Sequence, residues 1–409
     1  MRYVIIGNSA AGIGAAEKIR QLDSTGEITI ITNEPYHTYS RPLISYLLQG
    51  KTDEQRMKYR DDSFYEKHNC RLLTEKTVVE VCPDKKCVVL DDCKLLPYDK
   101  LLVATGSSAF VPPIEGLDTV KDKFTFMSLS DAKKLQAALG KEKKVLILGA
   151  GLIGLKCAEG ILDKVKEITV VDLAPRILSS ILDDEGAGIV QAHLESKGIK
   201  FVLSANVNCF SGNTAVLSNN ESVEFDILVV AVGVRPNTKL LSGIADIDRG
   251  ILINDRCETT AKDIYAAGDC TQTIDVSSGK SKIMALLPNA YMQGECAGAN
   301  MAGSDMSFSK AIPMNAIGFF GLHIITAGTY EGEVYIDKRG GGYKKLFYSP
   351  EKLNGYILIK NVEKAGIYTS LIREQTPLSS IDFSLICERP GLMAFTKEDR
   401  SKMLGGAVS

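Results

Sequence analysis

The amino-acid sequence predicts an α/β protein that contains two copies of one strand–helix–strand unit. Residues 4–12 match residues 146–154, and in both copies a short apolar run leads into glycines and then into a helical pattern. Strand, helix and strand in this order are typical of a parallel sheet. The elements expected in the two copies are helices over 13–22 and 155–165, second strands over 28–31 and 168–171, and closing strands over 101–106 and 227–233.

The composition is that of an ordinary globular protein. The chain has 409 residues, of which 45% are hydrophobic and 24% are charged, and this length suggests about two or three domains. The net charge is −2 and there is no long basic stretch, so we expect no nucleic-acid partner. The first residues leave no room for a charged leader, and the longest apolar run, 227–234, is too short to span a membrane. We therefore expect a soluble, cytoplasmic protein with no membrane partner.

Each copy places glycines between its first strand and its helix. The first glycine of such a loop permits a tight turn, the second lets the backbone approach a pyrophosphate, and the third lets the helix pack on the strand. The phosphates then lie at the helix N-terminus, where free N–H groups favour anions. Two matching loops predict two Rossmann-like dinucleotide-binding domains, although Ser9 replaces the second glycine of the first loop. The loop residues assigned to nucleotide binding are Gly7, Ser9, Ala10, Ala11 and Gly12 in the first copy, and Gly149, Gly151, Leu152, Ile153 and Gly154 in the second.

An acidic residue about 20 residues after each loop is expected to bind the ribose hydroxyls. Asp172 ends the second strand of the second copy, and its carboxylate would repel a 2′-phosphate, which favours NADH over NADPH. Arg176 lies close enough in the sequence to weaken that preference. In the first copy we assign the ribose contact to Glu34, two residues after the strict repeat position at Thr32. The alternative is that Glu34 only caps the turn before Pro35.

These motifs resemble the FAD/NAD(P)-dependent pyridine nucleotide–disulfide oxidoreductase superfamily. The stretch 264–270, Ile-Tyr-Ala-Ala-Gly-Asp-Cys, is its most specific match, and in the superfamily the aspartate, here Asp269, holds the FAD ribityl chain. The stretch 288–294 resembles a segment that begins a helix against the flavin ring, where the helix dipole would stabilise reduced flavin. The resemblance implies FAD in the first unit and the nicotinamide nucleotide in the second. The further cofactor-binding residues are Val78 (through its backbone, to the adenine), Ala104, Thr105, Gly106, Gly233, Gly268, Asn289 and Ala290.

The same resemblance implies three domains. The FAD-binding domain is split between residues 1–112 and 242–309, and the NAD-binding domain, 113–241, is inserted between the two parts. Residues 310–409 resemble the small C-terminal α+β domain of the superfamily, with an expected strand over 353–359. This domain would shield the flavin and contact the acceptor or a second subunit.

Residues 34–43 resemble a narrower group within the superfamily. They follow the E-P-Y-x-x-Y-x-R-P-x-L pattern of rubredoxin and ferredoxin reductases and of the N-terminal module of nitrite reductase large subunits, with Ile44 in place of the final leucine. In those proteins the arginine, here Arg41, contacts FAD. The following segment, here Pro42 and Leu43, lies beside the flavin ring.

Two charged positions of that group are changed in this chain. Several of the reductases carry a lysine near flavin N5 where this chain has Tyr46, and many carry a glutamate where this chain has Lys156. If the backbones match, Lys156 points toward flavin N5 and the nicotinamide, and its charge stabilises the electron-rich reduced flavin. We therefore assign Lys156 as the catalytic residue. The alternative is a structural ion pair between Lys156 and Glu159 or another carboxylate.

The cysteines do not match the thiol-dependent branches of the superfamily. Disulfide reductases need a dithiol early in the FAD domain, and NADH oxidases and coenzyme A disulfide reductases need one cysteine within residues 41–45, but the first cysteine here is Cys70. Cys82 and Cys87 have the spacing of a redox dithiol, yet they flank the expected turn of a β-hairpin, 83–86. No two close cysteine pairs are present to bind zinc or an iron–sulfur cluster, so we expect no metal site.

The sequence thus predicts an FAD-dependent electron transferase that uses NAD. NADH would give a hydride to flavin N5, and the reduced flavin would pass single electrons to a small iron protein. Rubredoxin is the acceptor that the resemblance favours; the other is a ferredoxin-like iron–sulfur subunit, as in the flavoproteins that accompany CO dehydrogenases, with flow in either direction. The alternatives are an NADH oxidase or thiol–disulfide reductase, and a non-catalytic FAD/NAD-binding assembly protein. A homodimer and a subunit of a larger complex both stay open.

Overall fold

The computed structural model describes residues 1–403, and the chain divides into two compact units. The first unit comprises Met1–Thr273 and Ile283–Phe308. The second comprises Ile274–Lys282 and the residues from Ser309 onward. The last six residues of the predicted C-terminal domain, 404–409, lie outside the described residues. Most residues of the two predicted nucleotide-binding domains fall within the first unit, but Ile274–Lys282 and Ser309 of the predicted FAD-binding domain belong to the second unit. The boundaries between the two nucleotide-binding domains stay a prediction.

The first glycine loop belongs to a five-stranded parallel sheet with the strand order β19-β7-β1-β2-β3. Its strands are β1 (Arg2–Ile6), β2 (Glu27–Ile31), β3 (Cys70–Leu73), β7 (Lys100–Val103) and β19 (Ile264–Ala266). Two helices, α1 (Ala10–Leu22) and α7 (Leu287–Met301), cover one face. The other face packs on an antiparallel meander of β4 (Val78–Cys82), β5 (Cys87–Leu90) and β6 (Leu95–Pro97). Because both faces are covered, the strands are apolar almost throughout.

The second glycine loop belongs to a sheet of the same construction, with the order β12-β11-β10-β16-β9 and all strands parallel. The strands are β9 (Lys123–Phe124), β10 (Lys144–Leu148), β11 (Glu167–Val171), β12 (Ile199–Val202) and β16 (Ile227–Val230). A second meander covers one face, with β13 (Val207–Ser211), β14 (Thr214–Leu217) and β15 (Ser222–Glu224). The helices of this part are α4 (Leu129–Ala138), α5 (Leu152–Ile161) and α6 (Asp184–Glu195). The repeat seen in the sequence is therefore a repeat of topology, and the predicted α/β class is confirmed.

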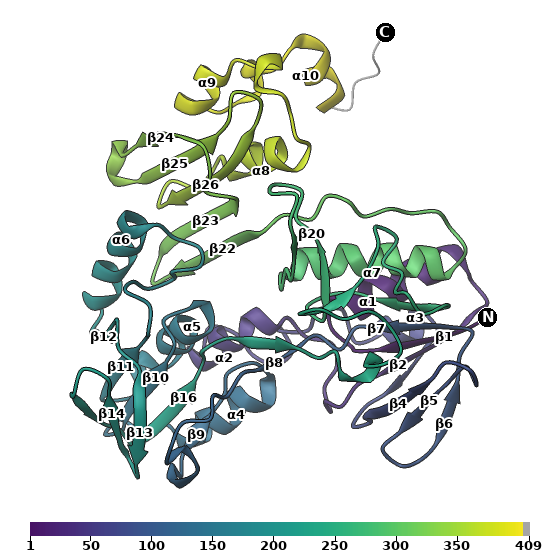
Figure 1. The fold of residues 1–409 in the computed structure, drawn as a ribbon, viewed down its shortest axis with the longest axis horizontal. Coiled ribbons are helices and arrows are strands. Elements are labelled where there is room, and N and C mark those ends of the chain that lie inside the picture. Colours follow the sequence, from purple (N-terminus) through teal and green to yellow (C-terminus); the bar gives the residue numbers. More distant parts are fainter. Residues whose placement is uncertain (404–409) are drawn as a thin grey trace. The chain divides into compact units, whose positions relative to one another are not determined.

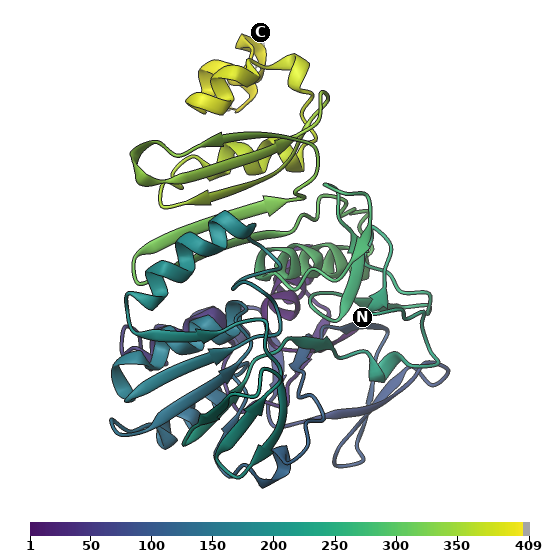
Figure 2. The same cartoon turned by 60° about the vertical axis from the view of Figure 1, so that its left-hand side comes forward.

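Helices α1 and α7 cross at unusually short range, side by side in both views of the ribbon (Figures 1 and 2). A Cβ atom on Gly294 would lie 2.0 Å from the carbonyl oxygen of Ala11, and one on Gly298 would lie 2.5 Å from that of Ala15. On the facing helix, a Cβ on Gly14 would lie 2.6 Å from the carbonyl oxygen of Tyr291. The glycines therefore allow backbone-to-backbone contact. This contact holds α1, which begins at the first glycine loop, against α7, which contains residues 288–294.

Two connections join the parts of the first unit. The chain leaves the first sheet through β8 (Ser107–Ala109) and returns through β17 (Val234–Pro236), and these strands pair antiparallel. The short helix α2 (Ile44–Leu48) packs against α5, where a Cβ on Gly160 would lie 3.1 Å from the carbonyl oxygen of Ser45. The remaining short elements of this region are α3 (Phe64–Lys67), β18 (Ile251–Leu252), β20 (Thr271–Ile274) and β21 (Ser281–Lys282).

The second unit is an α+β domain with an antiparallel sheet in the order β22-β23-β26-β25-β24. The strands are β22 (Met314–Phe319), β23 (Leu322–Gly328), β24 (Glu333–Asp337), β25 (Tyr343–Tyr348) and β26 (Leu353–Ile359). The helices are α8 (Ala365–Arg373), α9 (Phe383–Glu388) and α10 (Lys397–Met403). Apolar residues of α8 and α9 form one core with Leu346, Tyr356 and Leu358 of the sheet. The strand expected over 353–359 is confirmed as β26.

Candidate functional site

The first glycine loop turns sharply between β1 and α1. Gly7 has φ +126°, and a Cβ there would lie 2.1 Å from the carbonyl oxygen of Ala104. A Cβ on Gly12 would lie 2.0 Å from the carbonyl oxygen of Gly7. Both positions therefore require glycine, as the motif predicts. Ser9 is the N-cap residue, and its side chain makes no capping hydrogen bond, so the N–H groups of Ala10 and Ala11 at the start of α1 point to a place suited to phosphate.

The second loop repeats this geometry between β10 and α5. Gly149 has φ +106° with a Cβ position 2.3 Å from the carbonyl oxygen of Ala231, and the Cβ of Gly154 would lie 2.0 Å from the carbonyl oxygen of Gly149. In front of Gly151, the N-cap residue, nothing lies within 4 Å. Gly233 (φ +119°) also faces open space. The helix start at Leu152 and Ile153 thus borders a cradle that a side chain at Gly151 would fill.

Asp172 follows β11 and holds the second loop in place. Its carboxylate accepts hydrogen bonds from the backbone N–H of Ala150 (2.6 Å) and of Ala174 (2.7 Å). Arg176 does not contact Asp172 in this arrangement. Instead its guanidinium donates to the carbonyl oxygen of Leu182 (3.2 Å) and lies 3.0 Å from the carboxylate of Asp184. The structure therefore places the acidic residue at the loop and engages the arginine elsewhere.

Glu34 and Arg41 meet beside the first loop. The carboxylate of Glu34 accepts hydrogen bonds from Arg41 (2.6 Å) and from the hydroxyl of Tyr39 (2.7 Å). The same hydroxyl accepts the backbone N–H of Leu129 (3.0 Å) at the start of α4, so the cluster reaches the part of the chain predicted to bind NAD. Pro42 is in the short 3-10 turn that follows. Glu34 thus does more than cap the turn before Pro35, and its contact with a ribose stays a prediction.

A small hollow lies next to this ion pair, and two buried polar atoms without partners belong to one of its lining residues, His37, and to the residue that follows it, Thr38. The lining of the hollow includes Asn8, Ser9 and Glu34 together with His37. His37 Nδ1 bonds to the carbonyl oxygen of Thr38 (3.0 Å), whereas the buried His37 Nε2 and the buried hydroxyl of Thr38 have no hydrogen-bond partner within the described chain. Because an unsatisfied buried polar group costs about 1–3 kcal/mol, such atoms suit contact with a polar ligand. They fit the phosphate or adenosine part of FAD.

Asp269 is a half-buried carboxylate with little local support. Its one hydrogen bond to a side chain of the described residues is a long one from the hydroxyl of Ser107 (3.4 Å). Burial raises the pKa of Asp269, and the Ser107 hydroxyl and the charge of Arg41 oppose this only in part. A ribityl hydroxyl would supply the missing donor, so this position also fits FAD.

The side-chain amides of Gln293, which is buried, and of Asn237, which is half-buried, hold the loops around Asp269. Gly268, with φ +85°, donates its N–H to the side-chain oxygen of Gln293 (2.8 Å) on α7. Asn237 exchanges hydrogen bonds with Thr105, since its amide donates to the Thr105 carbonyl (2.8 Å) and its own carbonyl accepts the Thr105 hydroxyl (2.7 Å). The sequence motifs assign no role to the side chains of Gln293 and Asn237, because each of these side chains acts on a residue far away along the chain.

The other predicted FAD residues lie around these loops in the first unit. Ala104 is the residue that the backbone of Gly7 approaches, and Gly106 (φ +64°) faces open space. Asn289 and Ala290 are buried in the first turn of α7. Val78 is buried in the core between the first sheet and its meander, so only its backbone can take part in binding.

Lys156 is on α5 and forms an ion pair with the buried carboxylate of Glu159. Its ammonium also lies 4.7 Å from the ring centroid of Tyr46 on α2. The structural ion pair that was the alternative for Lys156 is therefore present. Helix α2 follows the Arg41–Pro42 segment, and α5 begins at the second glycine loop. Lys156 therefore lies where the helix after Arg41–Pro42 contacts the helix of the second loop. Its role toward the flavin stays a prediction.

The cysteine pair Cys82 and Cys87 occupies the expected hairpin, with the two residues opposite each other at the ends of β4 and β5. All ten cysteines are free thiols. No cluster of His, Cys, Asp or Glu suited to a metal ion occurs among residues 1–403. Within the same residues, no helix has the length and apolar character needed to cross a membrane.

Relatives of known sequence match almost the whole of this chain. The NADH-dependent phenylglyoxylate dehydrogenase subunit epsilon of Aromatoleum evansii is 32% identical over 394 residues, which cover 93% of each chain. The nitrite reductase [NAD(P)H] of Bacillus subtilis (strain 168) is 32% identical over 392 residues, which cover 92% of this chain. This chain spans only 48% of that relative, about half its length.

Solved structures of related proteins also match this chain over most of its length. The NAD-dependent persulfide reductase from A. fulgidus matches with a TM-score of 0.86 and 26% identity, over 94% of this chain and 79% of that one. The NADH:rubredoxin oxidoreductase from Clostridium acetobutylicum matches with a TM-score of 0.75 and 26% identity, over 92% and 96% of the two chains. A family model described as pyridine nucleotide-disulphide oxidoreductase matches residues 1–294. The resemblance inferred from the sequence is confirmed, and the chain belongs to the pyridine nucleotide–disulphide oxidoreductase family.

Proposed function

We propose that this protein is an NADH-dependent FAD oxidoreductase that passes electrons to a small one-electron iron protein. The observation that carries the proposal is the pair of glycine loops with one geometry in a single compact unit, joined where α2 packs on α5. An iron-protein acceptor is supported by relatives such as the rubredoxin-NAD(+) reductase of Pseudomonas putida, which is 29% identical over 311 residues. Rubredoxin and a ferredoxin-like protein are the two acceptor classes that we propose.

The residues around the two loops have distinct tasks in this proposal. FAD, when bound, supplies the chemistry that accepts a hydride from NADH and releases its electrons one at a time. Asp269, Arg41 and the N-terminus of α1 would hold its ribityl and phosphate groups, because they offer an acceptor, a cation and free N–H donors. Asp172 and the N-terminus of α5 would orient NADH.

We assign Lys156 to tuning the flavin. A cation near the isoalloxazine ring stabilises the reduced, electron-rich form, so we expect Lys156→Ala to lower the midpoint potential. A shift of roughly 30 mV would correspond to about 1.4 kcal/mol for a two-electron couple. The measurement is a spectroscopic redox titration of the FAD-loaded protein. Lys197→Ala, at an exposed position after α6, is the matched control. A potential that stays the same in Lys156→Ala would refute the assignment and leave only the structural pair with Glu159.

A second form of the proposal places this chain inside a larger enzyme. It is favoured by the Aromatoleum evansii relative, which is a subunit of an NADH-dependent dehydrogenase and matches this chain over 93% of both lengths. In that form the iron protein is a neighbouring subunit, and electrons run from it to NAD+. Reduction of NAD+ by the protein in the presence of reduced ferredoxin would distinguish this direction from NADH oxidation.

The decisive experiment is an anaerobic titration of the holoprotein with NADH, followed by addition of oxidised rubredoxin or ferredoxin. We expect the flavin band to bleach at one equivalent of NADH per flavin, because no dithiol is placed at the loops, and to recover when the iron protein is reduced. A second equivalent would reveal a thiol centre and favour a disulfide reductase. Bleaching that only oxygen reverses would favour an oxidase, and no bleaching by NADH would favour the non-catalytic assembly role.

A further inference from the structure

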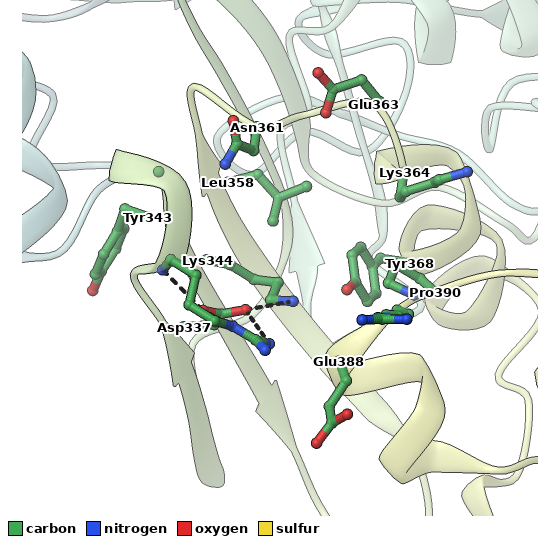
Figure 3. Close-up of a pocket in the computed structure, with 13 residues that line it drawn as sticks. Asp337, Tyr343, Lys344, Leu358, Asn361, Glu363, Lys364, Tyr368, Glu388 and Pro390 are labelled. Carbon is green, nitrogen blue, oxygen red and sulfur yellow. Dashed lines mark hydrogen bonds and ion pairs between the residues drawn. The ribbon is translucent and has the colours of Figure 1, made fainter.

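The second unit contains a cavity of about 460 Å³ that the proposed oxidoreductase chemistry does not use. It opens between the turn after β24, the connection from β26 to α8, and the end of α9 (Figure 3). Its floor includes the side chains of Leu358 and Tyr368. The volume lies within the range of about 300–1,000 Å³ that is usual for small-molecule sites.

One wall of the cavity is a hydrogen-bonded cluster of charges with a positive excess. The carboxylate of Asp337 accepts two hydrogen bonds from the guanidinium of Arg339 (2.9 and 2.8 Å) and lies 3.2 Å from the ammonium of Lys344. Lys344 also donates to the carbonyl oxygen of Cys387 (2.6 Å), which ties the wall to α9. These hydrogen bonds hold the pKa of Asp337 well below its usual range, so the carboxylate is charged and shared between two cations. The cluster therefore keeps one net positive charge.

The facing wall adds two further cations. Lys364 and Arg389 line the cavity, are exposed, and form no ion pair with any side chain of the described residues. The carboxylates of Glu363 and Glu388 also belong to the lining, but Figure 3 shows them at opposite ends of the hollow. They do not converge as the ligands of a divalent cation must. The lining has four cations and three carboxylates, which leaves one net positive charge. One of the three carboxylates, Asp337, is already paired within the first wall.

The turn that closes the cavity is rich in glycine. Gly340 and Gly341 have φ +66° and +68°, and Gly342 itself lines the cavity. Lys360 donates to the carbonyl oxygen of Gly340 (3.4 Å) and brings another cation beside the turn. A turn without side chains exposes backbone N–H groups and lets a ligand approach the main chain closely.

We propose that this cavity binds a small organic molecule through an oxyanion group, a phosphate ester or a carboxylate, held between Arg389 and Lys364 on one side and the Arg339–Lys344 wall on the other. All lining residues of the site belong to the second unit, and none of them is a residue of the nucleotide loops.

The test is isothermal titration calorimetry of the full-length holoprotein with glycerol 3-phosphate and with citrate, repeated at low and high salt. We expect saturable binding of at least one probe, with stronger affinity at low salt, and an affinity at least tenfold lower in the Arg389→Gln/Lys364→Gln double variant. Both residues are exposed, so the variant should fold normally, which its flavin spectrum and melting temperature would verify. Lys397→Gln, at an exposed position of the same unit, is the control and should bind as the unaltered protein does.

The two probes distinguish the chemical classes. Tighter binding of glycerol 3-phosphate would identify phosphate esters, and tighter binding of citrate would identify carboxylates. Binding that excess NAD+ abolishes would assign the probe to a nucleotide loop and overturn the proposal. Absence of binding by both probes, or equal binding by the double variant, would overturn it as well.

Discussion

Some polar side chains of the first unit have few hydrogen-bond partners within the described residues, so a bound ligand would complete their hydrogen bonding. Asp269 is the clearest example, because it is a half-buried carboxylate whose single hydrogen bond to a side chain of the described residues is 3.4 Å long. A group of this kind gains more from a bound hydroxyl than a solvated carboxylate does, since its desolvation has already taken place. Its contribution should therefore appear in cofactor affinity.

We predict that Asp269→Ala weakens FAD binding by about 10- to 100-fold, or ~1.4–2.7 kcal/mol, because a buried donor of the cofactor loses its acceptor. The measurement is the equilibrium titration of apoprotein with FAD, followed by flavin fluorescence. Asp269→Asn keeps one acceptor oxygen and should lose less. Asp118→Ala, at an exposed site, should bind FAD normally. An undiminished affinity in Asp269→Ala would show that the carboxylate does not hold the cofactor.

Asp172 makes a second prediction at this scale. Asp172→Asn keeps an oxygen for the N–H of Ala150 or Ala174 but removes the charge that repels a 2′-phosphate. We expect the ratio of kcat/KM for NADPH to that for NADH to rise by about tenfold, which corresponds to ~1.4 kcal/mol. Steady-state kinetics with both nucleotides measure it. Arg176→Gln should leave the ratio nearly unchanged, because Arg176 is engaged by Leu182 and Asp184. A large effect of Arg176→Gln would instead restore the influence on NADPH that its sequence position suggests.

At the scale of elements, the crossing of α1 and α7 controls the first loop. The contact is so close that the carbonyl oxygen of Ala11 lies 2.0 Å from the Cβ position of Gly294. Since α1 starts at the glycine loop and α7 carries Gln293, which holds Gly268, a change in their spacing would move both sides of the proposed FAD site.

We predict that Gly294→Ala destabilises the holoprotein by roughly 1–3 kcal/mol, because the added methyl group must push the two backbones apart. Thermal or urea unfolding of FAD-saturated protein measures the change. The matched control is Gly188→Ala on α6, where nothing lies within 4 Å of the new methyl group. That variant should gain up to about 1 kcal/mol, since alanine restricts the unfolded chain. Equal stabilities for the two variants would contradict the proposed role of the crossing.

The elements also show what can be predicted from sequence and what cannot. The two loops, their helices and the hairpin at Cys82 and Cys87 follow from residues that are close together in the chain, so local patterns suffice. Helix α5 departs from its prediction: it begins at Leu152 and ends at Ile161, where a 3-10 turn replaces the expected continuation to residue 165. Its N-terminal boundary lies directly at the loop, because the capping residue is Gly151 itself.

Contacts between distant segments are harder to predict. Asn237 bonds to Thr105 across more than a hundred residues, and the hydroxyl of Tyr39 accepts the N–H of Leu129 from a distant part of the chain. A single sequence contains no signal for such partners. Many polar side chains could accept or donate the same hydrogen bond, and the sequence does not show which of them the fold brings close. The pairing of Lys156 with Glu159 is the exception, since residues three apart on a helix share a face.

At the scale of the whole molecule, stability in acid depends on carboxylates that join separate elements. Asp263 is bound by Lys86 (2.6 Å), from the hairpin turn between β4 and β5, and by Lys100 (2.8 Å), from β7. These two hydrogen bonds lower the pKa of Asp263 to about 2. Because the pKa is lower in the folded state, the contribution is fully present above about pH 4 and is lost as the pH falls toward 2.

We predict that Asp263→Asn reduces the free energy of unfolding by roughly 1–2 kcal/mol at pH 7, since solvent screens part of the ion pairs, and that the difference from the unaltered protein shrinks as the pH approaches 2. Urea unfolding at several pH values measures this dependence. Asp61→Asn removes an exposed ion pair with Lys67 and should change the stability little at any pH. A deficit of Asp263→Asn that stayed constant down to pH 2 would mean that the carboxylate acts through its shape and not through its charge.

The ribbon of β8 and β17 has a consequence for how such a chain can be rebuilt. The segment between these strands starts and finishes side by side, since Ala109 pairs with Val234 and the five strands of the first sheet all come from outside it. Because the two ends of this segment are adjacent, a short turn between β8 and β17 could replace it. The strands of the first sheet would then keep their lengths. Residues 110–233, most of the predicted NAD-binding domain, thus form an insertion with adjacent ends. We expect that the corresponding segment of a relative with the opposite nucleotide preference can replace it between Ala109 and Val234.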